Sequence, residues 1–127
     1  MAATVSKEQA IHSFWSEFGW KAYDENTVPD NAMTVNNGHY LTYSVPVAGF
    51  DEPVTATASL WHRSTSWADI SAKSEAIYDA IGMGGVIRHY TGGAMWVKRG
   101  RPFAQRMPDE DDTIRRVYIN VEIEFFT

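Results

Sequence analysis

Hydrophobic and polar residues alternate most regularly at the end of the chain. Between Arg115 and Thr127 the odd positions are apolar and the even positions are mainly polar. The apolar set is Val117, Ile119, Val121, Ile123 and Phe125. A period of two predicts a long strand with one buried face and one polar face. Because a chain rarely ends on its longest strand unless that strand lies inside a sheet, we expect residues 114–127 to form an interior strand that organises the fold.

Two other segments have the spacing of amphipathic helices. The first begins at Ser6, where Gln9 completes a capping box, and stops near Gly19. The second is capped by one of residues 64–66 and ends at Gly82. The apolar stripes contributing to the predicted core are Ile11, Phe14 and Phe18 in the first helix and Ile70, Ile77 and Ile81 in the second.

Shorter alternating runs predict two hairpins. The first joins residues 39–47 to residues 54–63, and the second joins residues 86–90 to residues 94–99. The pair Gly92-Gly93 between the last two runs is typical of a tight primed turn. Residues 20–38 are rich in Asn, Asp, Pro and Gly, which predicts an irregular crossing segment.

Residues 99–112 follow neither period and are strongly charged, so we expect a long loop there. Long ordered loops are usually functional, which makes this segment the expected location of any site. The order α-β-β-α-β-β-β predicts an α+β protein with two helices packed on a mainly antiparallel sheet. We expect residues 1–127 to form a single domain.

Composition narrows the class of protein. The 127 residues are 44% hydrophobic and 21% charged, as in a folded domain of ordinary size. The lack of cysteine excludes disulfides, thiolate zinc sites and a cysteine nucleophile. No apolar run approaches the ~20 residues of a membrane span, and no secretory signal is visible at the N-terminus. We therefore expect no membrane partner.

The net charge of −5 conceals a basic stretch. Between residues 88 and 106 there is no acidic residue, but there are five basic ones: Arg88, Lys98, Arg99, Arg101 and Arg106. Four acids follow directly at residues 109–112. A basic patch of this kind could face a phosphate backbone or an acidic neighbour, or the two segments could neutralise each other on one surface.

The sequence shows no pattern typical of catalysis. The four histidines lack metal-ligand spacing, and residues 109–112 lack the alternating ligands and the glycine of a calcium loop. There is no G-x-S-x-G elbow and no complete nucleotide-binding glycine motif. Glu122 and Glu124 share a strand face and are expected to be surface or subunit contacts. We expect no enzyme activity, no cofactor and no metal.

Five stretches in order resemble the tail terminator proteins, also called tail completion or minor capsid proteins, of long-tailed phages and prophages of Gram-positive bacteria. They are FGWKAYDENTVP at 18–29, HYLTYSV at 39–45, SLWHRSTSW at 59–67, GRPFAQRM at 100–107 and DDTIRRVYINVEIEF at 111–125. The resemblance implies a small α+β subunit of a hexameric ring. Such a ring caps the head-proximal end of the tail tube, stops tube polymerisation and provides the head-joining surface.

The resemblance and the charge pattern together define the expected contacts. The partners are further copies of the chain, the tail tube protein, a head-side neck or stopper protein and, non-specifically, passing DNA. The location is the neck end of a virion assembled in the host cytoplasm. Candidates for the subunit interface are Arg99, Arg101, Arg106, Asp109, Asp111, Asp112, Arg115 and Arg116. Candidates for facing the tube or its lumen, on the second hairpin, are Arg88, Trp96 and Lys98.

Three alternatives remain open from sequence. The protein could be another neck component, such as a head-completion, stopper or adaptor protein. It could instead be a ligand-binding or enzymatic α+β domain, built around Trp15, Trp20, Trp61 and Trp67. Finally, the second hairpin could serve only to complete the sheet.

Overall fold

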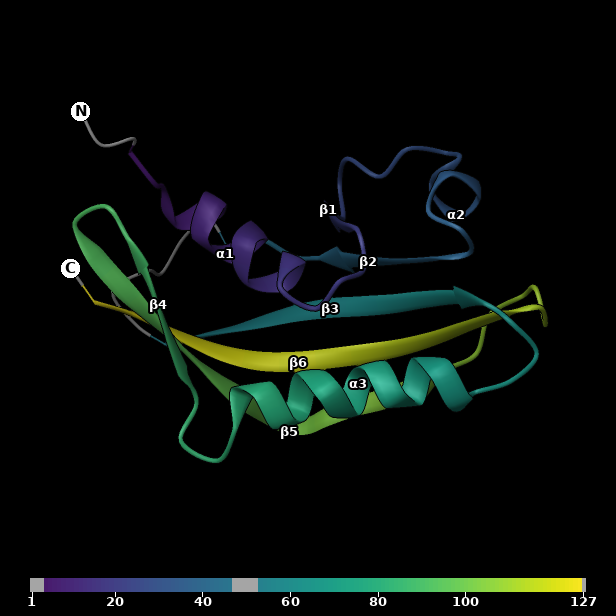
Figure 1. Ribbon diagram of the computed structural model, residues 1–127. Coiled ribbons are helices and arrows are strands. Elements are labelled where there is room, and N and C mark those ends of the chain that lie inside the picture. The colour runs from purple at the N-terminus through teal and green to yellow at the C-terminus, as the bar shows by residue number, and fades with distance from the viewer. Residues whose placement is uncertain (1–3, 47–52, 127) are drawn as a thin grey trace.

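The computed structural model describes residues 4–46 and 53–126 (Figure 1). The elements in chain order are α1 (Lys7–Ser16), β1 (Ala22–Asp24), α2 (Ala32–Val35), β2 (His39–Tyr43), β3 (Val54–Arg63), α3 (Ala68–Ile81), β4 (Val86–Tyr90), β5 (Gly93–Met107) and β6 (Ile114–Phe126). The fold therefore combines helices with one six-stranded sheet, in agreement with the α+β prediction. The predicted order of elements is wrong, because the described chain contains one further strand and one further helix.

Strand β6 lies inside the sheet, as its pattern predicts. The strand order is β1-β2-β3-β6-β5-β4, and β6 is antiparallel to both of its neighbours. Its odd residues from Val117 to Phe125 are all buried, whereas the even residues between them are half-exposed. The predicted strand is confirmed over residues 114–126, and Thr127 lies outside the described residues.

Helix α1 begins at the predicted capping box. The Ser6 hydroxyl accepts from the Gln9 backbone N–H at 3.1 Å, and the Gln9 side chain accepts from the Ser6 N–H at 2.8 Å. The helix packs against β1 and β4, the two outermost strands in the sheet order. Because one helix of ten residues reaches both edges, the sheet must curl around it. Figure 1 shows α1 in this position.

Helix α3 buries the predicted stripe. Ile70, Ile77 and Ile81 are at most 1% exposed and belong to the same core cluster as the inward residues of α1 and β6. The N-cap of the helix is Trp67, so the predicted cap among residues 64–66 is wrong, although the Ser66 hydroxyl accepts from the Ala68 N–H at 3.1 Å. The predicted core is confirmed, except that Phe18 is only partly buried.

The segment predicted to be irregular contains β1 and α2. Strand β1 pairs in parallel with β2, with Ala22 opposite Leu41, and both residues are buried. Helix α2 is one turn long, and its end is held by Asn36, whose side-chain amide donates to the Ala32 carbonyl at 2.8 Å and to the Tyr23 hydroxyl at 2.9 Å. Elements of three and four residues are too short to show a period, which explains why the pattern did not reveal them.

The long loop expected at residues 99–112 is wrong over most of its length, because β5 continues to Met107. The strand is interrupted by a bulge at residues 100–103, between the pairs Arg99–Val121 and Ala104–Ile119. Four residues thus oppose Asn120 alone, and the Asn120 side chain donates to the Pro102 carbonyl at 3.1 Å. This bulge shifts the alternation of β5 and thereby hid the strand.

The hairpin between β4 and β5 exists, but its turn differs from the prediction. Tyr90 pairs with Gly93, so Thr91 and Gly92 are the central residues. Only Gly92 has a positive φ, at +91°, whereas a primed turn places the first central residue in that region. Gly93 instead begins β5, where a side chain would collide with the Phe126 carbonyl oxygen.

Candidate functional site

The predicted contact residues are distributed among three places in the fold. The first is the N-terminal end of α3, beside Trp67. The Arg106 guanidinium lies 4.6 Å from the centre of the Trp67 ring, and the Arg115 guanidinium lies 5.2 Å from it. Arg115 also donates to the carbonyls of Thr65 and Asp112, each at 2.9 Å. Arg115 therefore ties the start of α3 to the connection between β5 and β6.

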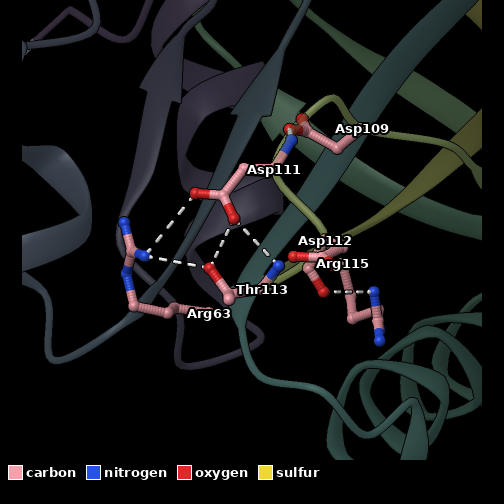
Figure 2. A network of polar contacts seen from close by, with 6 residues as sticks. All are labelled: Arg63, Asp109, Asp111, Asp112, Thr113 and Arg115. Atoms are coloured by element: carbon pink, nitrogen blue, oxygen red, sulfur yellow. Dashed lines mark hydrogen bonds and ion pairs between the residues drawn. The ribbon is translucent and has the colours of Figure 1, made fainter.

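That connection, residues 108–113, is here named the acidic turn (Figure 2). The Asp109 carboxylate accepts from the Asp111 N–H at 2.9 Å. The Asp111 carboxylate accepts from the Thr113 hydroxyl at 2.6 Å and from the Thr113 N–H at 2.9 Å, and it lies 3.8 Å from Arg63. The hydrogen bond from the Thr113 hydroxyl is the main cause that lowers the pKa of Asp111. These two carboxylates therefore fix the shape of the turn.

The other two acids of the acidic turn point to solvent. Glu110 and Asp112 are exposed, and neither carboxylate has a hydrogen bond or an ion pair within the described part of the chain. Asp112 contributes only its backbone carbonyl to the network in Figure 2. Glu110 is not among the predicted interface candidates, although the same run of acids contains it.

The second place is the C-terminal end of α3. Arg99 donates from Nε and Nη2 to the Tyr78 carbonyl at 3.0 and 2.8 Å, and its guanidinium lies 3.3 Å from the centre of the Tyr78 ring. Tyr78 in turn meets the edge of Phe103 in the bulge, with ring centres 5.3 Å apart. A cation at the C-terminus of a helix interacts favourably with the unpaired carbonyls there. Arg99 therefore stabilises the end of α3.

Beside this helix end lies a hollow of about 770 Å³, here named the bulge groove. Its walls are the end of α3, the following loop, the bulge of β5 and one residue of β6. The residues that line it include Tyr78, Met83, Lys98, Arg99, Arg101, Phe103 and Glu122. Met83 is 97% exposed. Arg101 is also exposed, and its side chain has no partner in the described ranges. An apolar residue between two glycines, as Met83 is, was the available sequence signal for this groove.

The three residues expected to face the tube make contacts within the chain. Arg88 binds the Glu17 carboxylate with two hydrogen bonds of 2.6 and 2.7 Å, which raise the pKa of its guanidinium. The Trp96 indole donates to the Gly84 carbonyl at 2.7 Å. Lys98 lies 4.3 Å from the centre of the Trp96 ring and 3.6 Å from the carboxylates of both Glu122 and Glu124. The paired glutamates thus hold a lysine of the neighbouring strand.

The third place is the polar face of the sheet, which carries Arg116. This guanidinium donates to the Ser59 hydroxyl at 3.2 and 3.1 Å and lies 4.7 Å from the centre of the Trp61 ring. Trp61 stacks on Tyr40 with ring centres 6.1 Å apart. Because Arg116 belongs to the outward positions of β6 and Arg115 to the inward ones, these adjacent arginines lie on opposite faces.

Sequence reasoning missed a cluster of Trp20, His39 and His62. The two histidines are directly opposite each other on β2 and β3, and both rings lie against Trp20, with centres 4.7 and 5.8 Å away. Asp69 and Lys73 of α3 line the same hollow. Burial is the largest cause that lowers the pKa of His39, followed by the charges of His62 and Lys73. The described residues contain no group of three or more metal ligands.

The four tryptophans proposed as one ligand site lie in different environments. Trp15 is fully buried in the core against Phe14. Trp20 contacts the histidines, Trp61 lies on the polar face of the sheet, and Trp67 lies beneath arginines at the start of α3. Trp20 and Trp61 line different hollows. This arrangement gives no support to a single aromatic pocket.

Comparisons with known proteins show a likeness at the level of structure. No protein-family model matches the sequence, and no curated protein matches it. Among the residues described, no helix is both long and apolar enough to cross a membrane. The fold is similar to that of a chain in the virion of a native gene transfer agent (GTA) particle, with a TM-score of 0.63 and 18% sequence identity over 94% of each chain. At this identity the likeness establishes a shared fold.

Proposed function

We propose that the protein is a structural component of a phage-type virion and has no catalytic role. The observation that carries this proposal is the fold shared with a chain of a gene transfer agent virion, which extends over 94% of both chains. A likeness of this extent includes the sheet and the helices that cover it, so it does not depend on one common motif. It favours a protein that assembles with other virion proteins.

The more specific proposal is a tail terminator of a long-tailed phage or prophage of a Gram-positive host. The support is the resemblance of five ordered stretches, from residues 18–29 to residues 111–125. In this role the chain is a single-domain subunit of a hexameric ring at the neck end of the tail. Its partners are other copies of the chain, the tail tube protein and the head-side neck or stopper protein.

A ring of this kind provides a physical mechanism for ending tube growth. Head-to-tail contacts between identical subunits close into a ring whose two faces are chemically different. One face matches the last layer of the tube, and the other does not, so no further tube subunit can be added. The second face is then free to bind the head. Neither step requires a bond to be made or broken.

The hairpin of β4 and β5 is our candidate for the element that faces the tube or its lumen. Arg88 and Lys98 keep part of their side chains exposed although both are in ion pairs. A pair of this kind can exchange an internal carboxylate for a partner's acid or for the phosphate of passing DNA, because exposed ion pairs contribute little free energy. The hairpin also completes the sheet, so its pairing alone does not distinguish these roles.

Deletion of the gene from the genome that encodes it, followed by electron microscopy of lysates, tests the proposed function. We expect headless tails of abnormal and uncontrolled length, because tube growth has no terminator. Tails of normal length that fail to join heads, or heads that leak DNA, would assign the protein to a stopper or adaptor role on the head side. Normal intact virions would contradict both assignments.

A further inference from the structure

We propose that the contact between neighbouring subunits is formed by the acidic turn of one copy seated in the bulge groove of the next. This inference rests on the proposed function, since it assumes that copies of the chain form a ring. Beyond the ring itself, it identifies the two surfaces that meet and the charged side chains that pair across them.

The two surfaces lie at opposite ends of α3. The acidic turn is attached to the start of the helix, since the Ser64 N–H donates to the Thr113 carbonyl at 2.8 Å and Arg115 reaches the Thr65 carbonyl at 2.9 Å. The bulge groove is attached to its end through Tyr78 and Arg99. Figure 1 shows the turn between β5 and β6 at the right and the end of α3 at the left.

This separation prevents the two surfaces from meeting within one chain. A helix of 14 residues is about 21 Å long at the usual rise of about 1.5 Å per residue. Two different surfaces that fit each other but lie apart on one molecule produce a heterologous, head-to-tail contact between copies. Such a contact can repeat around a closed ring, with each subunit donating its turn to one neighbour and receiving a turn from the other.

The charges of the two surfaces are complementary. The bulge groove is lined by Lys98, Arg99 and Arg101 against a single acid, Glu122. The acidic turn has four consecutive acids, and Arg63 and Arg115 are the bases that contact it. Electrostatic complementarity of this kind selects the partner surface and fixes its register.

The side chains left without a partner indicate which pairs form. In the groove, Lys98 and Arg99 are already engaged, but Arg101 has no partner among the residues described. In the turn, Asp111 is engaged with Thr113 and Arg63, but the carboxylates of Glu110 and Asp112 are unpaired in the described chain. Arg101 of one copy therefore pairs with Glu110 or Asp112 of its neighbour.

An exposed apolar side chain gives the same groove a hydrophobic component. Met83 is 97% exposed, and it shares the groove with the rings of Tyr78 and Phe103. Burial of a large apolar side chain stabilises a complex in a way that charge pairs alone do not, and methionine adapts its shape to irregular surfaces. Together these residues suit a partner segment whose tip carries acidic side chains and whose sides pack against the apolar residues of the groove.

Two charge-reversal variants test the contact, with the mass in solution measured by native mass spectrometry or light scattering. Arg101→Glu reverses the groove, and the double variant Glu110→Lys with Asp112→Lys reverses the turn. Each places like charges opposite each other, and we expect the dissociation constant between subunits to rise by about tenfold or more. Both proteins should keep the wild-type melting temperature, because exposed charges contribute little to the fold.

A mixture of the two variants is the decisive test of the proposed contact. In an equal mixture the reversed turn of one variant fits the reversed groove of the other, and the remaining contact is native. We expect the mixture to regain the wild-type mass with alternating subunits, as should a single chain carrying all three substitutions. Matched controls are Lys21→Glu and Glu75→Lys, exposed positions outside both surfaces, which should keep the wild-type mass.

The outcomes separate failure of the contact from failure of the ring. If the wild type forms rings and both reversals still do so, the proposed contact is wrong while the proposed function stands. If the wild type stays monomeric even with tail tubes, the ring itself is wrong and the contact with it. If Arg101→Glu keeps the ring but loses binding to a short DNA duplex, the groove is a nucleic-acid surface and the subunit contact is overturned.

Discussion

Strands β5 and β6 lie side by side, but they differ in regularity and in the role we assign to them. Strand β6 alternates between buried and half-exposed residues from Val117 to Phe125 and pairs with strands on both sides. Strand β5 pairs with β4 only as far as Val97, and beyond that point it carries the bulge, four bases and the groove. The regular strand holds the core together, whereas the irregular one beside it presents charges to solvent.

Charged residues that are near each other in sequence thus serve different purposes in the structure. Arg99 binds the end of α3, Arg115 binds its start, and Arg116 lies on the far face of the sheet. The Arg101 side chain, in contrast, has no hydrogen bond, ion pair or ring contact within the described chain. The candidate interface residues stay predictions, but their surroundings divide them into those that support the fold and those that are free to bind a partner.

The largest expected loss of stability is that of a substitution in β6. Ile119 is fully buried between β3 and β5, so Ile119→Ala should lower the free energy of unfolding by ~2–5 kcal/mol. Urea denaturation monitored by circular dichroism measures it. Phe103→Ala, in the bulge of β5, removes a partly buried ring and should cost less. An equal or greater loss at Phe103 would break the distinction between the two strands.

Adding a side chain in the bulge, where its backbone approaches β6, should also lower the stability of the protein. A Cβ added at Gly100 would lie 2.5 Å from the Asn120 carbonyl oxygen and 2.7 Å from its carbon, both backbone atoms that cannot easily move. Gly100→Ala should therefore cost about 1–3 kcal/mol of stability. Gly84→Ala is the matched control, since its Cβ would meet nothing within 4 Å. Equal melting temperatures for the two variants would show that the bulge adjusts freely.

Substitutions of Arg99 and Arg101 in β5 should also differ in their effect on stability. Arg99→Met removes two hydrogen bonds and a cation from the end of α3, and should cost about 1–2 kcal/mol. Arg101→Met removes no hydrogen bond, ion pair or ring contact of the described chain, so its melting temperature should equal that of the wild type. We expect only the Arg101 variant to combine a native fold with weakened association. A loss of stability in both would mean that Arg101 also supports the fold.

The smallest expected effect is the pH dependence contributed by the histidine cluster. The folded pKa of His39 lies below its ordinary value of 6.5, so below pH 6.5 the unfolded chain binds more protons at this residue. Stability should thus be greatest above pH 6.5 and decline as the pH falls toward the folded pKa. His39→Gln should reduce this decline in thermal melts between pH 7.5 and about 5. An unchanged decline would assign the dependence to other groups.

The comparison of β5 with β6 also shows how far sequence reasoning reaches. The strand β6 and the stripes of α1 and α3 were predictable because their periods are local properties of the chain. The bulge was not, since it depends on Asn120 of the neighbouring strand. Likewise, Arg99 is a structural residue only because its partner is a carbonyl 21 positions away. The pair His39–His62 required the register of two strands, which no local pattern contains.

The mass of the wild-type protein in solution, measured alone and with tail tubes, is the direct test of whether the chain is a ring subunit of the tail. A structural ring subunit should give closed particles of near six times the mass of the 14.3 kDa chain, and these should sit on one end of each tube in electron micrographs. A protein that remains a monomer under both conditions and leaves the tube ends bare would contradict the proposed ring and its role in the tail.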